Sequence, residues 1–240
     1  EFPLQRAGFA AGYHRTGRAD PALEREAVEL TKKADVVLLY IGLDEISESE
    51  GLDRPNMKLP GSQIRLLQMV SEANPHVVAV LSGGSPIEMP WIGQCEAVIH
   101  GYLSGQAGAA AMLNAILGKV NPSGKLNETY PLVYEDVPSA PYFPSRERNA
   151  EYREGLYVGY RYFETVGKPV RFPFGYGLSY TTFTYSDLTV NEQEASFTLA
   201  NTGERDGAET AQLYVRAKCS GVYRPAKELK GFRKVFLKAG

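Results

Sequence analysis

The sequence predicts an α/β protein: a three-layer α/β/α sandwich with a mainly parallel sheet, followed by an aromatic-rich connecting segment and an incomplete all-β sandwich. Helical and strand patterns alternate over the first half of the chain, which is typical of parallel strands joined by right-handed crossovers. A stretch rich in proline and tyrosine follows, and after Phe183 apolar and polar residues alternate. These three observations predict domains at residues 1–130, 131–182 and 183–240.

Three helices are predicted from capping residues and apolar spacing. Asp20-Pro21 is typical of an N-cap followed by proline at the first helical position. The helix that follows has an apolar stripe made of Leu23, Ala27, Leu30 and Ala34. A second helix is expected to begin with Ser62 as its cap and to end at Asn74. A third, rich in alanine, is expected over residues 106–117.

Three continuous β-rich runs, residues 36–43, 76–81 and 97–103, predict strands, and their lack of alternation is typical of burial on both faces. Beyond Phe183, alternation predicts strands at 196–200 and 211–215. About four strands fit there, whereas an immunoglobulin-type sandwich needs about seven. We therefore expect unpaired edges and uncovered apolar side chains at Phe197, Leu199, Leu213 and Val215.

Composition excludes several classes of protein. With 26 basic and 28 acidic residues, scattered along the chain, the net charge is −2, which argues against a nucleic-acid partner. No apolar run reaches the length of about 18 residues that a membrane helix needs. Cys95 and Cys219 lie far apart without a CxxC, which argues against a disulfide framework and a zinc site. Residues 1–6 resemble no signal peptide, so the compartment stays open, and the chain is expected to be a piece of a longer protein.

The candidate site lies in the acidic loop, residues 44–54. Ligands of open parallel sheets bind beyond the carboxyl ends of the strands, where residues 82–86 and 104–106 are also expected. The loop holds five carboxylates in ten residues, and crowding raises the pKa of a carboxyl, as a general acid at neutral pH requires. Gly51 would permit a sharp turn that presents Glu50, and Arg54 could neutralise Asp53. The alternative is a solvated acidic loop. We expect residues 44–58 to be exposed or mobile in this chain alone, because the partner surface that they should cover is missing.

Other candidate motifs are weak. Residues 83–86 fit neither glycine-rich nucleotide motif, and no GxSxG is present. His14, His76 and His100 lie apart, and two fall inside apolar strands, which favours structural roles. The tyrosines of residues 152–162 favour packing, although aromatic rings beside a polar cleft also hold sugars.

Several long motifs resemble glycoside hydrolase family 3. Glu50-Gly51-Leu52-Asp53-Arg54 followed by Leu59-Pro60-Gly61-Ser62-Gln63 is similar to the family's SEGxDR…LPxxQ stretch. The resemblance continues, in order, through residues 105–108, 118–126, 154–162 and 172–180. Residues 201–215 and 225–232 resemble the fibronectin type III-like domain that ends many β-glucosidases of the family.

The resemblance implies a retaining, exo-acting β-glucosidase in which Glu50 is the acid/base. Glu48 and, less favoured, Glu45 are nearby competitors, and Asp53 and Arg54 are candidates for supporting the loop. The family's nucleophile is an aspartate of a TIM-like barrel, in a Ser-Asp-Trp type motif; the one tryptophan here, Trp91, follows Pro90. We therefore expect the acid/base-bearing portion of an enzyme, inactive by itself.

The resemblance also sets the expected partners. These are a β-glucoside or oligosaccharide substrate and a barrel domain supplied by the rest of the polypeptide, with no metal, organic cofactor, nucleic acid or membrane. A homo-oligomer is left open. The alternatives are a β-xylosidase or an α-L-arabinofuranosidase of the same family, or a non-catalytic carbohydrate-binding module. The intact Glu50-Gly51-x-Asp53-Arg54 run argues against the last of these.

Overall fold

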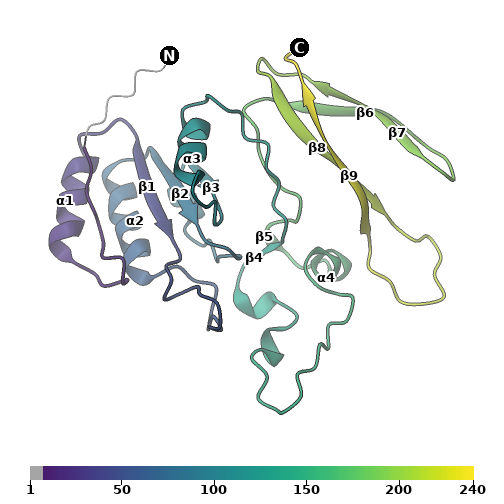
Figure 1. Ribbon diagram of the computed structural model, residues 1–240, viewed down its shortest axis with the longest axis horizontal. Helices are drawn as coiled ribbons and strands as arrows, with labels where there is room; N and C mark the ends of the chain where they lie inside the picture. Colours follow the sequence, from purple (N-terminus) through teal and green to yellow (C-terminus); the bar gives the residue numbers. More distant parts are fainter. Residues whose placement is uncertain (1–7) are drawn as a thin grey trace. The chain divides into compact units, whose positions relative to one another are not determined.

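A computed structural model describes residues 8–240, which divide into two compact units (Figure 1). The first unit comprises the chain up to Met112 together with Tyr130–Glu151, and the second comprises Leu113–Thr129 together with Tyr152–Gly240. Each unit is described by itself. The domain limits expected at residues 130 and 182 are drawn from changes in sequence pattern, whereas the two units are defined by spatial proximity. The expected limits stay a prediction.

The first unit contains a three-stranded parallel sheet. Its strands are β1 (Val37–Gly42), β2 (Val77–Ser82) and β3 (Ala97–His100), in the order β1-β2-β3 (Figure 1). Val37 pairs with Val77, and Val78 with Ala97. The three predicted strands are thus confirmed: β1 and β3 are shorter than their apolar runs, and β2 is shifted by one residue. Burial on both faces holds for the central strand, but not for β1, because β1 lies at an edge and Tyr40 is 57% exposed.

The helices of this unit follow the predicted order. They are α1 (Pro21–Thr31), α2 (Gly61–Ala73) and the first part of α3 (Gly108–Ile116), which passes into the second unit after Met112. A short 3-10 turn, η1 (Ile92–Gln94), precedes β3. α1 and α2 lie side by side, next to the β1 end of the sheet (Figure 1). The Asp20 cap is confirmed, since its Oδ1 accepts the Ala22 N–H at 2.9 Å.

Two details of these helices differ from the prediction. The buried face of α1 contains Glu24, Ala27 and Thr31 instead of the leucines of the predicted stripe. Glu24 is tolerated there because the Arg65 guanidinium of α2 lies 3.1 Å from its carboxylate. Ser62 does not cap α2: the N-cap is Pro60, and the Ser62 side chain is buried.

The core of the first unit lies between the sheet and α2. Its fully buried members include Leu66, Leu67, Val70, Val77, Ala79 and Leu81, together with Ile87 beyond β2. Trp91 is also buried, 3% exposed. The amide of Asn74, at the end of α2, donates to the carbonyls of Thr31 and Ala34 and so fixes the end of α1.

Residues 130–151 complete the first unit. They contain β4 (Tyr130–Pro131) and two short 3-10 turns, η2 (Tyr134–Asp136) and η3 (Ala140–Tyr142). The buried Glu88 connects this segment to the loop before α2. Its carboxylate accepts the Tyr134 N–H at 3.0 Å, and its own N–H donates to the Met57 carbonyl at 2.7 Å.

The second unit is mostly antiparallel. After α4 (Tyr160–Val166) and β5 (Val170–Phe172), it contains β6 (Phe183–Val190), β7 (Ala195–Asn201), β8 (Gly207–Val215) and β9 (Glu228–Leu237). β6 pairs with β7 and β8 with β9, each pair antiparallel (Figure 1). The predicted strands lie within β7 and β8. The helix α4 was missed, because seven residues are too few for a helical period to stand out.

Apolar side chains are exposed on these strands, as expected. Phe197, Leu213 and Val215 are exposed, whereas Leu199 is half-buried. An ion pair and several side-chain hydrogen bonds connect the segments of this unit. The Lys125 ammonium lies 2.9 Å from the Glu209 carboxylate, with both side chains largely buried. The Asn121 side chain accepts from Ser179 and Tyr180 and donates to the Asp206 carbonyl.

Candidate functional site

The acidic loop starts where β1 ends. Gly42, the last residue of β1, allows close contact with β2, since a Cβ there would lie 2.2 Å from the Ser82 carbonyl oxygen. Asp44 then accepts the Ser47 N–H at 2.8 Å, which turns the chain back. Burial alone would raise the pKa of Asp44, but the hydrogen bonds from Ser47 outweigh burial and lower it. Crowding among the carboxylates therefore does not raise the pKa of this residue.

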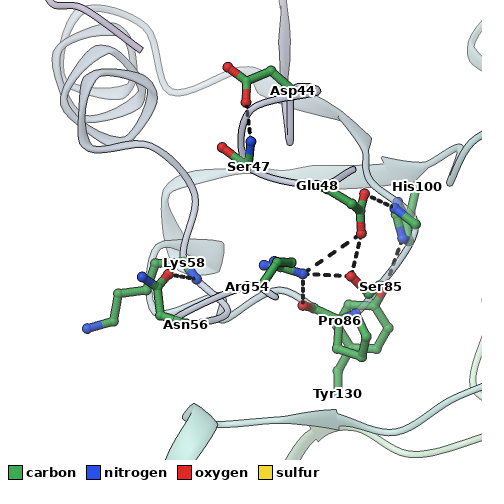
Figure 2. Close-up of polar contacts among 11 residues, drawn as sticks. Asp44, Ser47, Glu48, Arg54, Asn56, Lys58, Ser85, Pro86, His100 and Tyr130 are labelled. Atoms are coloured by element: carbon green, nitrogen blue, oxygen red, sulfur yellow. Dashed lines mark hydrogen bonds and ion pairs between the residues drawn. The ribbon is translucent and has the colours of Figure 1, made fainter. Parts of the chain in front are cut away.

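Glu48 is tied to the turn that follows β2. Its Oε2 accepts the Gly84 N–H at 2.6 Å, and its Oε1 accepts the Ser85 hydroxyl at 2.5 Å. The side chain is 19% exposed. Figure 2 shows that Glu48, Ser85 and Arg54 point toward one another. The acidic loop and residues 82–86, which follow β2, therefore lie together, as expected for two segments at the carboxyl ends of parallel strands.

Arg54 closes the same cluster from the far side of the loop. Its Nη1 donates to the Ser85 Oγ at 2.6 Å and to the Pro86 carbonyl at 3.3 Å, and it lies 4.0 Å from the Glu48 Oε1. The guanidinium is 17% exposed. Burial lowers its pKa, and the Glu48 charge opposes that change. Sequence proximity suggested Asp53 as the partner of Arg54, but the structure places Asp53 on the exposed side.

His100, at the end of β3, lies behind this cluster (Figure 2). Its Nε2 is 2.7 Å from the Tyr130 hydroxyl, and its Nδ1 is 3.3 Å from the Leu81 carbonyl oxygen. Burial lowers its pKa, while the hydrogen bond to Leu81 and the charge of Glu48 act in the opposite direction. These two contacts, both to groups of the first unit, are consistent with the structural role that the sequence favours for this histidine.

Glu50 lies on an exposed turn between these ties. The Leu52 N–H donates to the Ser49 carbonyl at 3.2 Å, and Gly51 has φ of 78°, which only glycine adopts without strain. The sharp turn expected at Gly51 is thus present. Glu45, the remaining competitor, lies at the surface, 2.7 Å from the exposed Arg15. The expectation that residues 44–58 are exposed holds for these two glutamates, but not for Glu48 or Arg54.

A cavity of about 340 Å³ opens beside the turn. It is lined by Glu48, Ser49, Leu52, Asp53, Arg54, Asn56, Met57, Tyr134 and Phe143. The last two come from residues 130–151, for which sequence reasoning proposed no site residue, because no local pattern reports a contact across so much sequence. Residues 104–106 are exposed at the start of α3 and do not line this cavity.

Residues 8–240 contain neither a clustered metal-ligand set nor a membrane-spanning helix. In this range no group of three or more His, Cys, Asp or Glu side chains is placed to hold a metal ion. No helix among the same residues is both long and apolar enough to cross a membrane. Cys95 and Cys219 are free thiols, and burial raises the pKa of Cys95.

Comparison with known proteins identifies both parts of the chain. Residues 10–180 match the glycosyl hydrolase family 3 C-terminal domain, and residues 209–240 match a fibronectin type III-like domain. An exo-alpha-(1->6)-L-arabinopyranosidase of Bifidobacterium breve is 48% identical over 242 residues, which cover 98% of this chain and 32% of that protein. The thermostable beta-glucosidase B of Acetivibrio thermocellus is 45% identical, covering 97% and 32%.

The same likeness holds in three dimensions. The crystal structure of a family 3 beta-glucosidase from Bifidobacterium adolescentis matches with a TM-score of 0.94 at 46% identity, covering 97% of this chain and 36% of that one. The chain therefore spans about a third of the length of the relatives it matches. Together with the parallel sheet and its acidic loop, these findings show that the chain belongs to glycoside hydrolase family 3.

Proposed function

We propose that this chain is the acid/base-bearing portion of a retaining, exo-acting glycosidase, and that Glu50 is its acid/base. The observation that carries the proposal is the contrast within the acidic loop. Glu48 is occupied by two short hydrogen bonds and Glu45 by a surface ion pair, whereas Glu50 is exposed on a glycine turn at the carboxyl end of the sheet. Its carboxyl group can therefore approach a sugar held by another domain.

The mechanism requires a second carboxylate. In retaining glycosidases a nucleophile attacks the anomeric carbon while the acid protonates the leaving oxygen, and the same group then deprotonates the water that releases the sugar. The two carboxyl groups lie about 5–5.5 Å apart. We propose that the nucleophile lies on a barrel domain in the part of the polypeptide that the longer relatives have in addition. The 240-residue chain alone should then be inactive, because general acid catalysis supplies only about 10²–10⁴-fold.

We propose a terminal β-D-glucosyl residue as the substrate group, since the beta-glucosidase of A. thermocellus and the beta-glucosidase structure from B. adolescentis are 45% and 46% identical to this chain over 97% of its length. An α-L-arabinopyranoside is the second candidate, because the B. breve relative, at 48% identity, is named for that sugar. The ratio of kcat/KM on the two p-nitrophenyl glycosides, measured with the full-length protein, decides between them.

The test of the acid/base is Glu50→Ala in the full-length protein, with Glu45→Ala as the matched control from the same loop. Glu50→Ala should lose about 10²–10⁴-fold on a disaccharide, whose leaving group needs a proton, and much less in the first step with a dinitrophenyl glycoside. Azide needs no general base, so it should restore turnover of Glu50→Ala and yield a glycosyl azide of retained configuration. Glu45→Ala should behave as wild type on both substrates.

Two outcomes would count against the proposal. Equal losses on both substrates without azide rescue would remove Glu50 from acid/base chemistry. No loss in any variant, with retained sugar binding, would favour the non-catalytic carbohydrate-binding module.

A further inference from the structure

We propose that Glu48 is a positioning residue: it anchors the acidic loop to the turn after β2 and so sets the place of Glu50. The inference rests on the proposed function of Glu50. Glu48 lies two residues before Glu50 in the same acidic loop, so the sequence alone does not distinguish the roles of the two glutamates.

The loop needs such an anchor. The chain between β1 and α2, residues 43–60, contains neither helix nor strand, and loops of this kind are the mobile parts of a fold. A general acid must nevertheless lie within hydrogen-bond distance of the leaving oxygen, and a displacement of about 1 Å can cost about 10²-fold in rate. Glu50 itself lies on an exposed turn, so its position has to be fixed by its neighbours.

Glu48 supplies the first tie. Both of its carboxylate oxygens accept hydrogen bonds from the turn after β2, from the Gly84 N–H at 2.6 Å and the Ser85 hydroxyl at 2.5 Å. Hydrogen bonds to an ionised carboxylate are among the stronger ones in proteins. β2 is the central strand of the sheet, so the loop is tied to a turn that directly follows this strand.

Arg54 supplies the second tie, at the same hydroxyl. Ser85 Oγ donates to Glu48 and accepts from Arg54, so both ends of the loop tip, residues 49–53, are fastened at one point (Figure 2). Glu50 and Gly51 lie within this closed tip. The guanidinium, 4.0 Å from the carboxylate, also balances its charge in a place where both side chains are more than four-fifths buried.

The same contacts argue against Glu48 as the proton donor. A general acid gains and loses a proton in each turnover, and protonated Glu48 would have to give up an acceptor site for Gly84 or Ser85. A carboxylate that stays ionised satisfies both donors and Arg54 together. The geometry therefore favours an anchoring role for Glu48 and leaves Glu50 as the proton donor of the proposal.

The experiment compares Glu48→Ala and Ser85→Ala with Glu50→Ala in the full-length protein, using Glu45→Ala as the control. Misplacing Glu50 weakens acid catalysis without removing it. Glu48→Ala should therefore lose about 10–100-fold in kcat on a disaccharide, with little change in KM and a smaller loss on a dinitrophenyl glycoside. Ser85→Ala should move in the same direction by a smaller factor. Azide should not rescue either variant.

A second measurement is independent of activity. Hydrogen–deuterium exchange on the 240-residue chain should show faster exchange of residues 83–86 and 49–53 in Glu48→Ala and unchanged exchange in Glu45→Ala. Fluorescence of Trp91 reports whether each variant is folded. Unchanged exchange in Glu48→Ala would overturn the proposal.

The kinetic outcomes separate the two proposals. If Glu50→Ala shows azide rescue and Glu48→Ala loses activity equally on all leaving groups, the positioning role fails while the acid/base assignment stands. If azide rescues Glu48→Ala and not Glu50→Ala, the acid/base is Glu48 and both proposals fall.

Discussion

Gln63 is predicted to be a main stabilising residue of the first unit, although it lies on a helix and touches no reacting group. Its side-chain amide pairs with the end of β1: the Gly42 N–H donates to the Gln63 Oε1 at 2.8 Å, and the Gln63 Nε2 donates to the Gly42 carbonyl at 2.9 Å. Both residues are buried. The amide thus takes the place of a neighbouring strand on the edge of the sheet.

Gln63→Ala removes both partners of Gly42 at once. An unsatisfied buried backbone group costs about 1–3 kcal/mol, so two cost about 2–6 kcal/mol. Water can reach the edge of a sheet more easily than its centre, and alanine gains a few tenths of a kcal/mol in helix propensity. We therefore expect a loss of about 2–3 kcal/mol in the free energy of unfolding.

Urea unfolding followed by Trp91 fluorescence is the assay, because this buried residue is the one tryptophan of the chain and lies in the same unit. With an m-value of about 2 kcal/mol/M, the midpoint should fall by about 1 M urea. Gln68→Ala is the matched control, since this glutamine is on the same helix and exposed, and its side chain donates to the exposed Glu72 at 3.1 Å. Equal midpoints for the two variants would refute the reasoning.

Two further predictions concern the core and the pH response. Leu67→Ala should cost about 2–5 kcal/mol in the same assay, because Leu67 is fully buried and its removal leaves a cavity; a loss under about 1 kcal/mol would show that the core collapses around the gap. Burial, together with the Glu209 carboxylate, raises the pKa of Tyr185 from 10.0 to about 12. The folded state then keeps a proton that the unfolded state releases, so this stabilisation is complete below pH 10 and lost as pH rises toward 12. Absorbance titration should show a tyrosine that ionises near pH 12 and that Tyr185→Phe removes, and an unchanged curve in that variant would contradict the assignment.

The sequence predicts the elements that depend on local pattern. Asp20-Pro21 marks the start of α1 because a cap and a fixed φ act within one turn, and the β-rich runs mark three strands because burial needs apolar residues. What local pattern misses is the partner from another element. Glu24 can be buried because Arg65 of α2 forms an ion pair with it. The residues around Glu24 in the sequence do not predict this partner.

The candidate site shows the same division. The family motif selects Glu50, and the glycine beside it predicts the turn that the structure contains. The sequence also suggests that Arg54 supports the loop, but it suggests the adjacent Asp53 as partner. The actual partners, Ser85 and Pro86, lie more than thirty residues away and are brought close by the parallel pairing of β1 with β2. Pairing between strands decides such contacts, and no spacing along the chain encodes it.

The chain alternates between the two units, and this affects what truncation or proteolysis can produce. The backbone passes from the first unit to the second after Met112, returns at Tyr130 and leaves again after Glu151. A single break, whether a stop codon or a protease nick, therefore cannot separate the two units cleanly. A break after Glu151 leaves Leu113–Thr129 of the second unit with the first, and a break after Met112 leaves Tyr130–Glu151 of the first unit with the second. Exchanging one unit without residues of the other would need the chain to be cut at more than one of its three crossings between the units.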